Sequence, residues 1–120
     1  MATLTETRHT AGFISSEANG NRSRKVITLL AAETTGGLAA GTVVGAMNAG
    51  DGTWGVYDNV NPDSADGVLI EAVDASSSNV SATIICRDAE VNEDELTIGG
   101  DSTSVTDAKT DLELLGIIYR

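Results

Sequence analysis

The chain has 120 residues, a formal net charge of −11 and a pI near 4.1, which together indicate one small acidic domain. Binding to a nucleic-acid backbone requires clustered lysine and arginine, so this charge balance excludes a nucleic-acid partner. No apolar run reaches the ~18 residues of a membrane span, and no basic and apolar leader opens the chain, so we expect a soluble protein with no membrane partner, made in the cytoplasm.

The charge is distributed unevenly along the chain. Residues 1–25 hold four basic and two acidic side chains, a net charge of +2, whereas residues 26–120 hold three basic and sixteen acidic side chains, a net charge of −13. A polar terminal segment without a core of its own becomes ordered through what it contacts. The sequence therefore predicts an extended arm at 1–25 that grips a partner and a compact domain at 26–120.

The domain must build its core from aliphatic side chains, because aromatic residues make up only 3% of the chain while hydrophobic residues make up 41%. A domain of this size buries only about two-thirds of the surface of its unfolded chain. We therefore expect it to gain stability by forming an oligomer.

Short runs of β-branched and apolar residues recur along the domain and predict strands. Glycines between two of these runs, at 48–52, predict a hairpin loop, because glycine readily adopts the positive φ angles of tight turns. The strand pattern at 80–88 is the strongest in the chain, and we expect residues 90 and 91 to continue the pairing of that strand. The predicted strands cover residues 26–30, 42–47, 53–58, 67–73 and 80–88, with a terminal strand at 117–120.

One helix is predicted near the C-terminus. Ser104 suits its N-cap, with Asp107 three residues later in the manner of a capping box, and Gly116 suits its C-terminal stop. Its apolar face is predicted to be Val105, Ala108, Leu112 and Leu115. Short strands, glycine turns and one late helix indicate a mainly-β domain.

The residue types that catalysis or zinc binding would require are scarce. Nucleophilic catalysis needs a base held rigidly beside a nucleophile, and the only histidine, His9, lies in the predicted arm. The only cysteine, Cys86, lies in an apolar predicted strand, where we expect a small buried side chain and where no internal disulfide is possible. We therefore expect no enzyme activity, no cofactor and no small-molecule substrate.

Two acidic runs, at 90–95 and 63–67, lack the alternating ligand spacing of a calcium loop, so we interpret them as solvated surface and predict no metal site. The glycine pairs at 36–37 and 99–100 lack the lysine and the strand-to-helix context of a phosphate loop, and we interpret them as turns.

Several segments, in order and at suitable intervals, carry a resemblance to a known family. They are HTAGFISSEANGNRSRK at 9–25, LAAGTVVGAM at 38–47, WGVYD at 54–58, GVLIEAVDA at 67–75, ATIICRDAEVN at 82–92 and LGIIYR at 115–120. This series resembles the phage head decoration proteins, the relatives of the lambda-type protein D.

The resemblance implies a β-clip-like fold and a homotrimer. It implies docking on the outer surface of an expanded tailed-phage head, at three-fold and quasi-three-fold positions, after synthesis in the host cytoplasm. There the trimer would clamp neighbouring copies of the major capsid protein and stabilise the shell against the pressure of packaged DNA. The resemblance implies no catalytic residues.

For the grip of the arm on the capsid we hypothesise β-augmentation, in which residues 10–15 extend and pair with a capsid strand. Burial of Phe13 and Ile14 would contribute about 1.5–3 kcal/mol each; the alternative is that both pack on the protein's own domain. Arg22, Arg24 and Lys25 would steer the encounter. The predicted capsid-binding residues are His9, Thr10, Ala11, Gly12, Phe13, Ile14, Ser15, Asn19, Arg22 and Arg24.

Trp54 and Tyr57 are predicted as further contacts, in the trimer interface or with the capsid, with core packing as the other role for Trp54. Other functions remain open on the sequence alone. The first is another virion component, such as a tail or baseplate β module, or a host surface-layer piece. A biotinyl or lipoyl carrier would need a lysine at the hairpin tip, and residues 48–52 contain none; a small enzyme is the third alternative.

Overall fold

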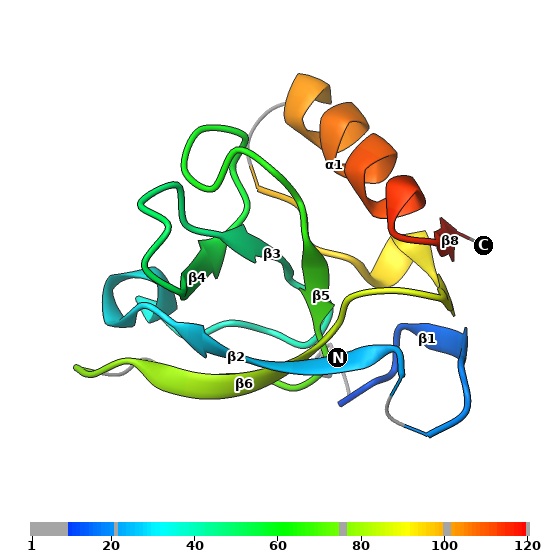
Figure 1. The fold of residues 1–120 in the computed structure, drawn as a ribbon, viewed down its shortest axis with the longest axis horizontal. Coiled ribbons are helices and arrows are strands. Elements are labelled where there is room, and N and C mark those ends of the chain that lie inside the picture. Colours follow the sequence, from blue (N-terminus) through cyan, green and yellow to red (C-terminus); the bar gives the residue numbers. More distant parts are fainter. Residues whose placement is uncertain (1–9, 21, 75–76, 100–101, 120) are drawn as a thin grey trace, which may run out of the picture.

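A computed structural model of the protein describes residues 10–20, 22–74, 77–99 and 102–119. The mainly-β architecture with one C-terminal helix is confirmed (Figure 1). Short 3-10 helices, η1 (Ala31–Thr34) and η2 (Glu93–Glu95), lie in two of the connections. The strands and the helix are β1 (Ile14–Glu17), β2 (Arg24–Leu29), β3 (Val43–Ala46), β4 (Thr53–Val56), β5 (Gly67–Leu69), β6 (Val80–Ile85), β7 (Ala89–Val91), α1 (Ser102–Leu114) and β8 (Ile117–Tyr119).

Five of the strands close into a barrel in the order β2-β4-β3-β5-β6. Strands β2 and β6 run antiparallel beside each other along six residue pairs, from Arg24 opposite Ile85 to Leu29 opposite Val80 (Figure 1). The hairpin predicted at 48–52 joins β3 to β4, and Gly50 and Gly52 in its loop have φ angles of 71° and 87°. β5 ends at Leu69, so the strand predicted at 67–73 is shorter than expected.

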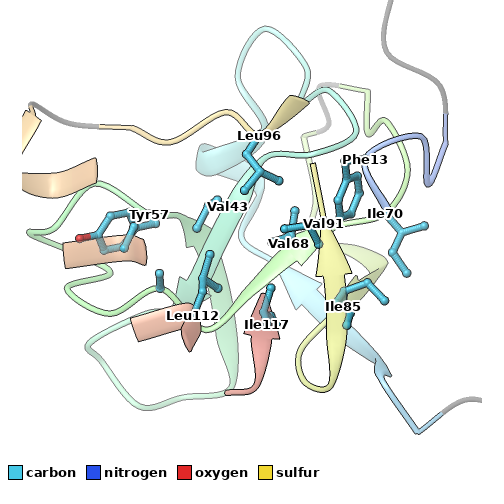
Figure 2. Close-up of a cluster of buried hydrophobic side chains, with 13 residues drawn as sticks. Phe13, Val43, Tyr57, Val68, Ile70, Ile85, Val91, Leu96, Leu112 and Ile117 are labelled. Atoms are coloured by element: carbon cyan, nitrogen blue, oxygen red, sulfur yellow. The ribbon is translucent and has the colours of Figure 1, made fainter. Parts of the chain in front are cut away.

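The alternation of side chains along each strand divides the core into two clusters. Ile27, Val44 and Ile84 point into the barrel and, with Leu29 and Leu69, belong to the first cluster, here called the inner cluster. On β3, β5 and β6, the preceding or following residues belong to a second cluster, here called the outer cluster (Figure 2). On β2 the neighbours of Ile27 are exposed instead. The outer cluster includes Val43, Val68 and Ile85 of the barrel together with Leu112 of α1 and Ile117 of β8.

A second sheet of three strands, in the order β1-β7-β8, covers the outer cluster. β7 is antiparallel to β1 and parallel to β8. The expectation that residues 90 and 91 continue the strand before them is wrong, because the chain leaves the barrel at Asp88, whose φ is 47°, and β7 joins this other sheet.

Of the four residues in the predicted apolar face of the helix, Ala108 and Leu112 are fully buried. Val105 and Leu115 are half-buried, and Leu115 lies just beyond the end of α1. The helix begins at Ser102, so Ser104 is not its N-cap. Ser104 is instead 4% exposed inside the first turn, and its carbonyl accepts a hydrogen bond from the hydroxyl of Tyr57. The helix ends before Gly116, whose φ of 82° allows the chain to turn into β8, as predicted.

Candidate functional site: the N-terminal segment and the barrel mouth

Residues 10–17 do not extend away from the domain. Residues 10–13 form a turn in which Ala11 has a φ of 57°, and the Ala11 N–H donates to the carbonyl of Ile70 at 2.7 Å. β1 then pairs with β7 of the same chain. Of the segment 10–15 that we hypothesised to extend and pair with a capsid strand, residues 10–13 therefore form a turn here and only Ile14 and Ser15 are in a strand, on β7 of the same chain. Pairing with a capsid strand stays a prediction.

Phe13 belongs to the core of the domain. Its side chain is 2% exposed, and Figure 2 shows it beside Val91 and Ile70. The N–H of Asn92 donates to the Phe13 carbonyl at 2.7 Å, and Ile14 packs half-buried against the same cluster. Of the two alternatives for these side chains, packing on the protein's own domain is the one that the structure has.

The other residues predicted for the arm divide into anchors and exposed groups. The guanidinium of Arg24 donates two hydrogen bonds to the carboxylate of Glu17, at 2.9 and 3.1 Å, and this hydrogen bonding raises the pKa of Arg24. The Arg22 guanidinium lies 3.8 Å from the carboxylate of Asp88 and is 69% exposed. His9 lies outside the described residues. Side chains or backbone are exposed at Thr10, Gly12, Ser15, Asn19 and Arg22.

β1 is an edge strand, since β7 is its one strand neighbour among the residues that the structure describes. An edge strand presents backbone N–H and C=O groups to which another chain can add a strand. The free edge of β1 is therefore a surface suited to β-augmentation, even though the segment itself is docked.

The two aromatic residues predicted as interface contacts lie in different environments. Tyr57 is 0% exposed, its hydroxyl donates to the carbonyl of Ser104, and it packs in the outer cluster, so its assignment as a surface contact is wrong. Trp54 is half-buried at the end of the inner cluster. The ammonium of Lys25 lies 5.4 Å from the centroid of its indole ring, within the range of a cation–π contact.

Trp54 forms one wall of a hollow with a volume of about 560 Å³, here called the barrel mouth. Lys25, Ala46 and Cys86 lie two residues beyond Ile27, Val44 and Ile84, and so extend the rows of side chains that face the barrel interior. This hollow was not predicted from the sequence, although the two-residue spacing of the side chains that line it is visible there. The residues that line it are Lys25, Ala46, Trp54, Asp66, Cys86, Arg87 and Leu115.

Asp66 lies at the rim of the barrel mouth, where one of its carboxylate oxygens accepts from the Ala46 N–H at 3.0 Å. Burial raises the pKa of Asp66, the charges of Asp111 and Asp63 add to this rise, and the Ala46 hydrogen bond and Lys25 oppose it. The folded protein therefore binds this proton more tightly than the unfolded chain. The resulting contribution to stability is complete below the unfolded pKa of ~3.9 and is lost as the pH rises through the folded pKa.

We predict that Asp66→Asn, which keeps an oxygen to accept from Ala46, raises the free energy of unfolding at pH 7. The gain should be below about 1 kcal/mol, because the site is partly solvated, and it should shrink as the pH falls toward 4. Urea unfolding at the two pH values measures it. Asp74→Asn removes one charge at an exposed site and controls for net charge. A lower stability of Asp66→Asn than of the unchanged protein at pH 7 would contradict the prediction.

Within the described ranges, no group of three or more His, Cys, Asp or Glu side chains converges as metal ligands would. No helix in the same part of the chain combines the length and the apolar character that crossing a membrane requires.

Comparison with known proteins gives one match. The family model described as bacteriophage lambda head decoration protein D matches residues 3–117. No curated protein and no solved structure matches the chain. Because the match covers nearly the whole length, the chain belongs to the bacteriophage lambda head decoration protein D family, and it is a non-enzymatic structural protein that decorates the surface of the virion capsid.

Proposed function

We propose that the protein binds the outside of an expanded tailed-phage head as a homotrimer, at three-fold and quasi-three-fold positions. It clamps neighbouring copies of the major capsid protein there and stabilises the shell against the pressure of packaged DNA. A ligand that binds the mature shell and not its ruptured state stabilises the shell by mass action. The function is therefore differential binding without turnover.

We infer that the N-terminal segment makes the capsid contact, now as a docked edge strand. The observation that carries this is the free edge of β1, held in place by the burial of Phe13 and by the Arg24–Glu17 pair. Ordering a free arm would cost about 1–2 kcal/mol for each backbone residue fixed. A docked strand has already met that cost, so more of its binding energy appears as affinity.

The exposed groups of the segment are suited to the contact, and the buried ones are not. Thr10, Gly12, Ser15 and Asn19 are exposed along the turn, on β1 and just after it, and Arg22 adds an exposed cation. A trimer presents three such segments at once, and linked weak contacts together give tight binding. A cyclic trimer also matches the symmetry of a three-fold position on the shell.

The test is binding to undecorated expanded heads. Deleting residues 2–9 should leave the domain folded, because the core residues begin at Phe13. The deleted residues hold one acid, Glu6, and one base, Arg8, so the net charge of the arm stays the same, and binding should weaken at least about tenfold through loss of the contacts that they make with the capsid. Cosedimentation with heads measures binding, and circular dichroism measures folding. Replacing residues 2–9 with a Gly/Ser linker of equal length separates sequence from length.

Full binding by the deletion variant would remove residues 2–9 from the contact. Imaging of heads decorated by the unchanged protein provides the second criterion. Protrusions on the head at positions other than the three-fold axes, or no gain in resistance to rupture, would overturn the proposal.

A further inference from the structure

The barrel mouth concentrates positive charge in a strongly acidic chain. Five of the residues that the structure describes are Lys or Arg, and two of them, Lys25 and Arg87, line this one hollow. One acid, Asp66, also lies at its rim, so the lining side chains carry two positive charges against one carboxyl group; the remaining wall is mostly apolar, with Trp54 as the largest side chain. The mouth of a barrel is a frequent location for binding sites, and this one suits an apolar anchor with acidic neighbours.

The same chain carries a segment of that chemistry in the connection from β4 to β5. Val60 is 73% exposed, although it is apolar, and the exposed carboxylates of Asp58 and Asp63 lie close to it in sequence. We call residues 58–63 the Val60 loop.

The Val60 loop is held in one conformation by hydrogen bonds. One Asp58 carboxylate oxygen accepts from the N–H groups of Val60 and Asn61, both at 2.9 Å. The side-chain amide of Asn48 donates to the Val60 carbonyl at 2.9 Å. A preorganised loop loses little conformational entropy on binding, so an apolar side chain at its tip is an efficient anchor.

We propose that the barrel mouth of one copy receives the Val60 loop of a neighbouring copy, with Val60 against Trp54 and the loop carboxylates facing Lys25 and Arg87. This rests on the homotrimer of the proposed function and assigns its subunit contact. The two surfaces differ from each other, so the contact is heterologous, and repeating it around an axis closes a ring. Charge complementarity selects another acidic copy as the occupant.

Disulfide trapping tests the contact directly. Cys86→Ser removes the native thiol, and Val60→Cys and Arg87→Cys are then placed on separate chains. Each variant alone should give no covalent dimer, because residue 60 of one copy does not meet residue 60 of another, and residue 87 does not meet residue 87. A mixture of the two variants should give a covalent dimer that is reduced to monomers by a reductant. The double variant should give a covalent trimer. Non-reducing electrophoresis is read both for the free protein at high concentration and for protein bound to expanded heads.

A charge exchange provides a second measurement that does not depend on thiols. Arg87→Glu should weaken self-association about tenfold, since it replaces an attraction with a repulsion, and adding Asp63→Arg in the same chain should restore it. Arg22→Glu changes the net charge equally but lies outside the barrel mouth, so it should leave self-association unchanged. Sedimentation velocity across a concentration series measures all three.

The two proposals fail in different ways. Suppose that trimers form, in solution or on heads, but the mixture gives no disulfide-linked dimer and Asp63→Arg does not restore the self-association of Arg87→Glu. The proposed subunit contact is then overturned, and capsid decoration is unaffected. The proposed contact is also overturned if the protein does not self-associate either in free solution or on expanded heads. Heads that do not bind the unchanged protein contradict the proposed function instead, whatever the thiols do.

Discussion

Phe13→Ala is expected to destabilise the domain by about 3–5 kcal/mol, the usual cost of deleting a buried aromatic side chain. Phe13 is 2% exposed and packs in the cluster that joins the barrel to α1 and the second sheet. Its removal leaves a cavity and weakens the attachment of β1. A small domain has a total stability of only about 5–15 kcal/mol, so this one change removes a large part of it. Urea unfolding followed by circular dichroism measures the loss.

Ser15→Ala is the matched control, because it truncates an exposed residue of β1 and should change the free energy of unfolding by less than about 0.5 kcal/mol. Near-equal stability of Phe13→Ala and Ser15→Ala would mean that the segment is not docked in solution. The comparison also affects the binding assays, since any loss of capsid binding by a Phe13 variant must first be corrected for the unfolded fraction.

The parts of the fold that the sequence predicted are those determined by local patterns. The hairpin at 48–52 was predicted because its turn needs positive φ angles, which glycine readily adopts. The buried face of α1 was predicted from the helical spacing of Ala108 and Leu112. The errors occur where tertiary contacts decide. β7 lies only a few residues beyond β6, and no local pattern indicates that its partners are β1 and β8.

The candidate site was harder to predict for the same reason. A polar, basic stretch around Phe13 is typical of a free arm, and only the pocket formed by Val91, Ile70 and their neighbours shows why that stretch is docked. Tyr57 was misassigned because a hydroxyl-bearing aromatic in a predicted strand fits either a surface or a core, and its hydrogen-bond partner, the carbonyl of Ser104, lies 47 residues away. The barrel mouth forms only because five strands close into a barrel, and the local sequence pattern of each strand does not specify that closure.

Gly41→Ala is expected to destabilise the domain by about 2–4 kcal/mol for two combined reasons. Gly41 has a φ of 91°, a conformation that side chains disfavour, and a Cβ there would lie 2.3 Å from the carbonyl oxygen of Glu95. The backbone cannot easily move to relieve this clash. The Gly41 N–H donates to the Leu69 carbonyl at 2.8 Å, and the Gly41 carbonyl accepts from the N–H of Thr97 at 2.9 Å.

Gly52→Ala separates the two causes, because Gly52 has nearly the same φ, 87°, and no atom lies within 4 Å of its added Cβ. It should cost only the conformational part, about 1–2 kcal/mol. The difference between the two variants in urea unfolding therefore measures the contact between residue 41 and the η2 segment that leads toward α1. Equal losses would show that this segment yields to the added methyl group, and that the close approach of Gly41 to Glu95 does not restrain the fold.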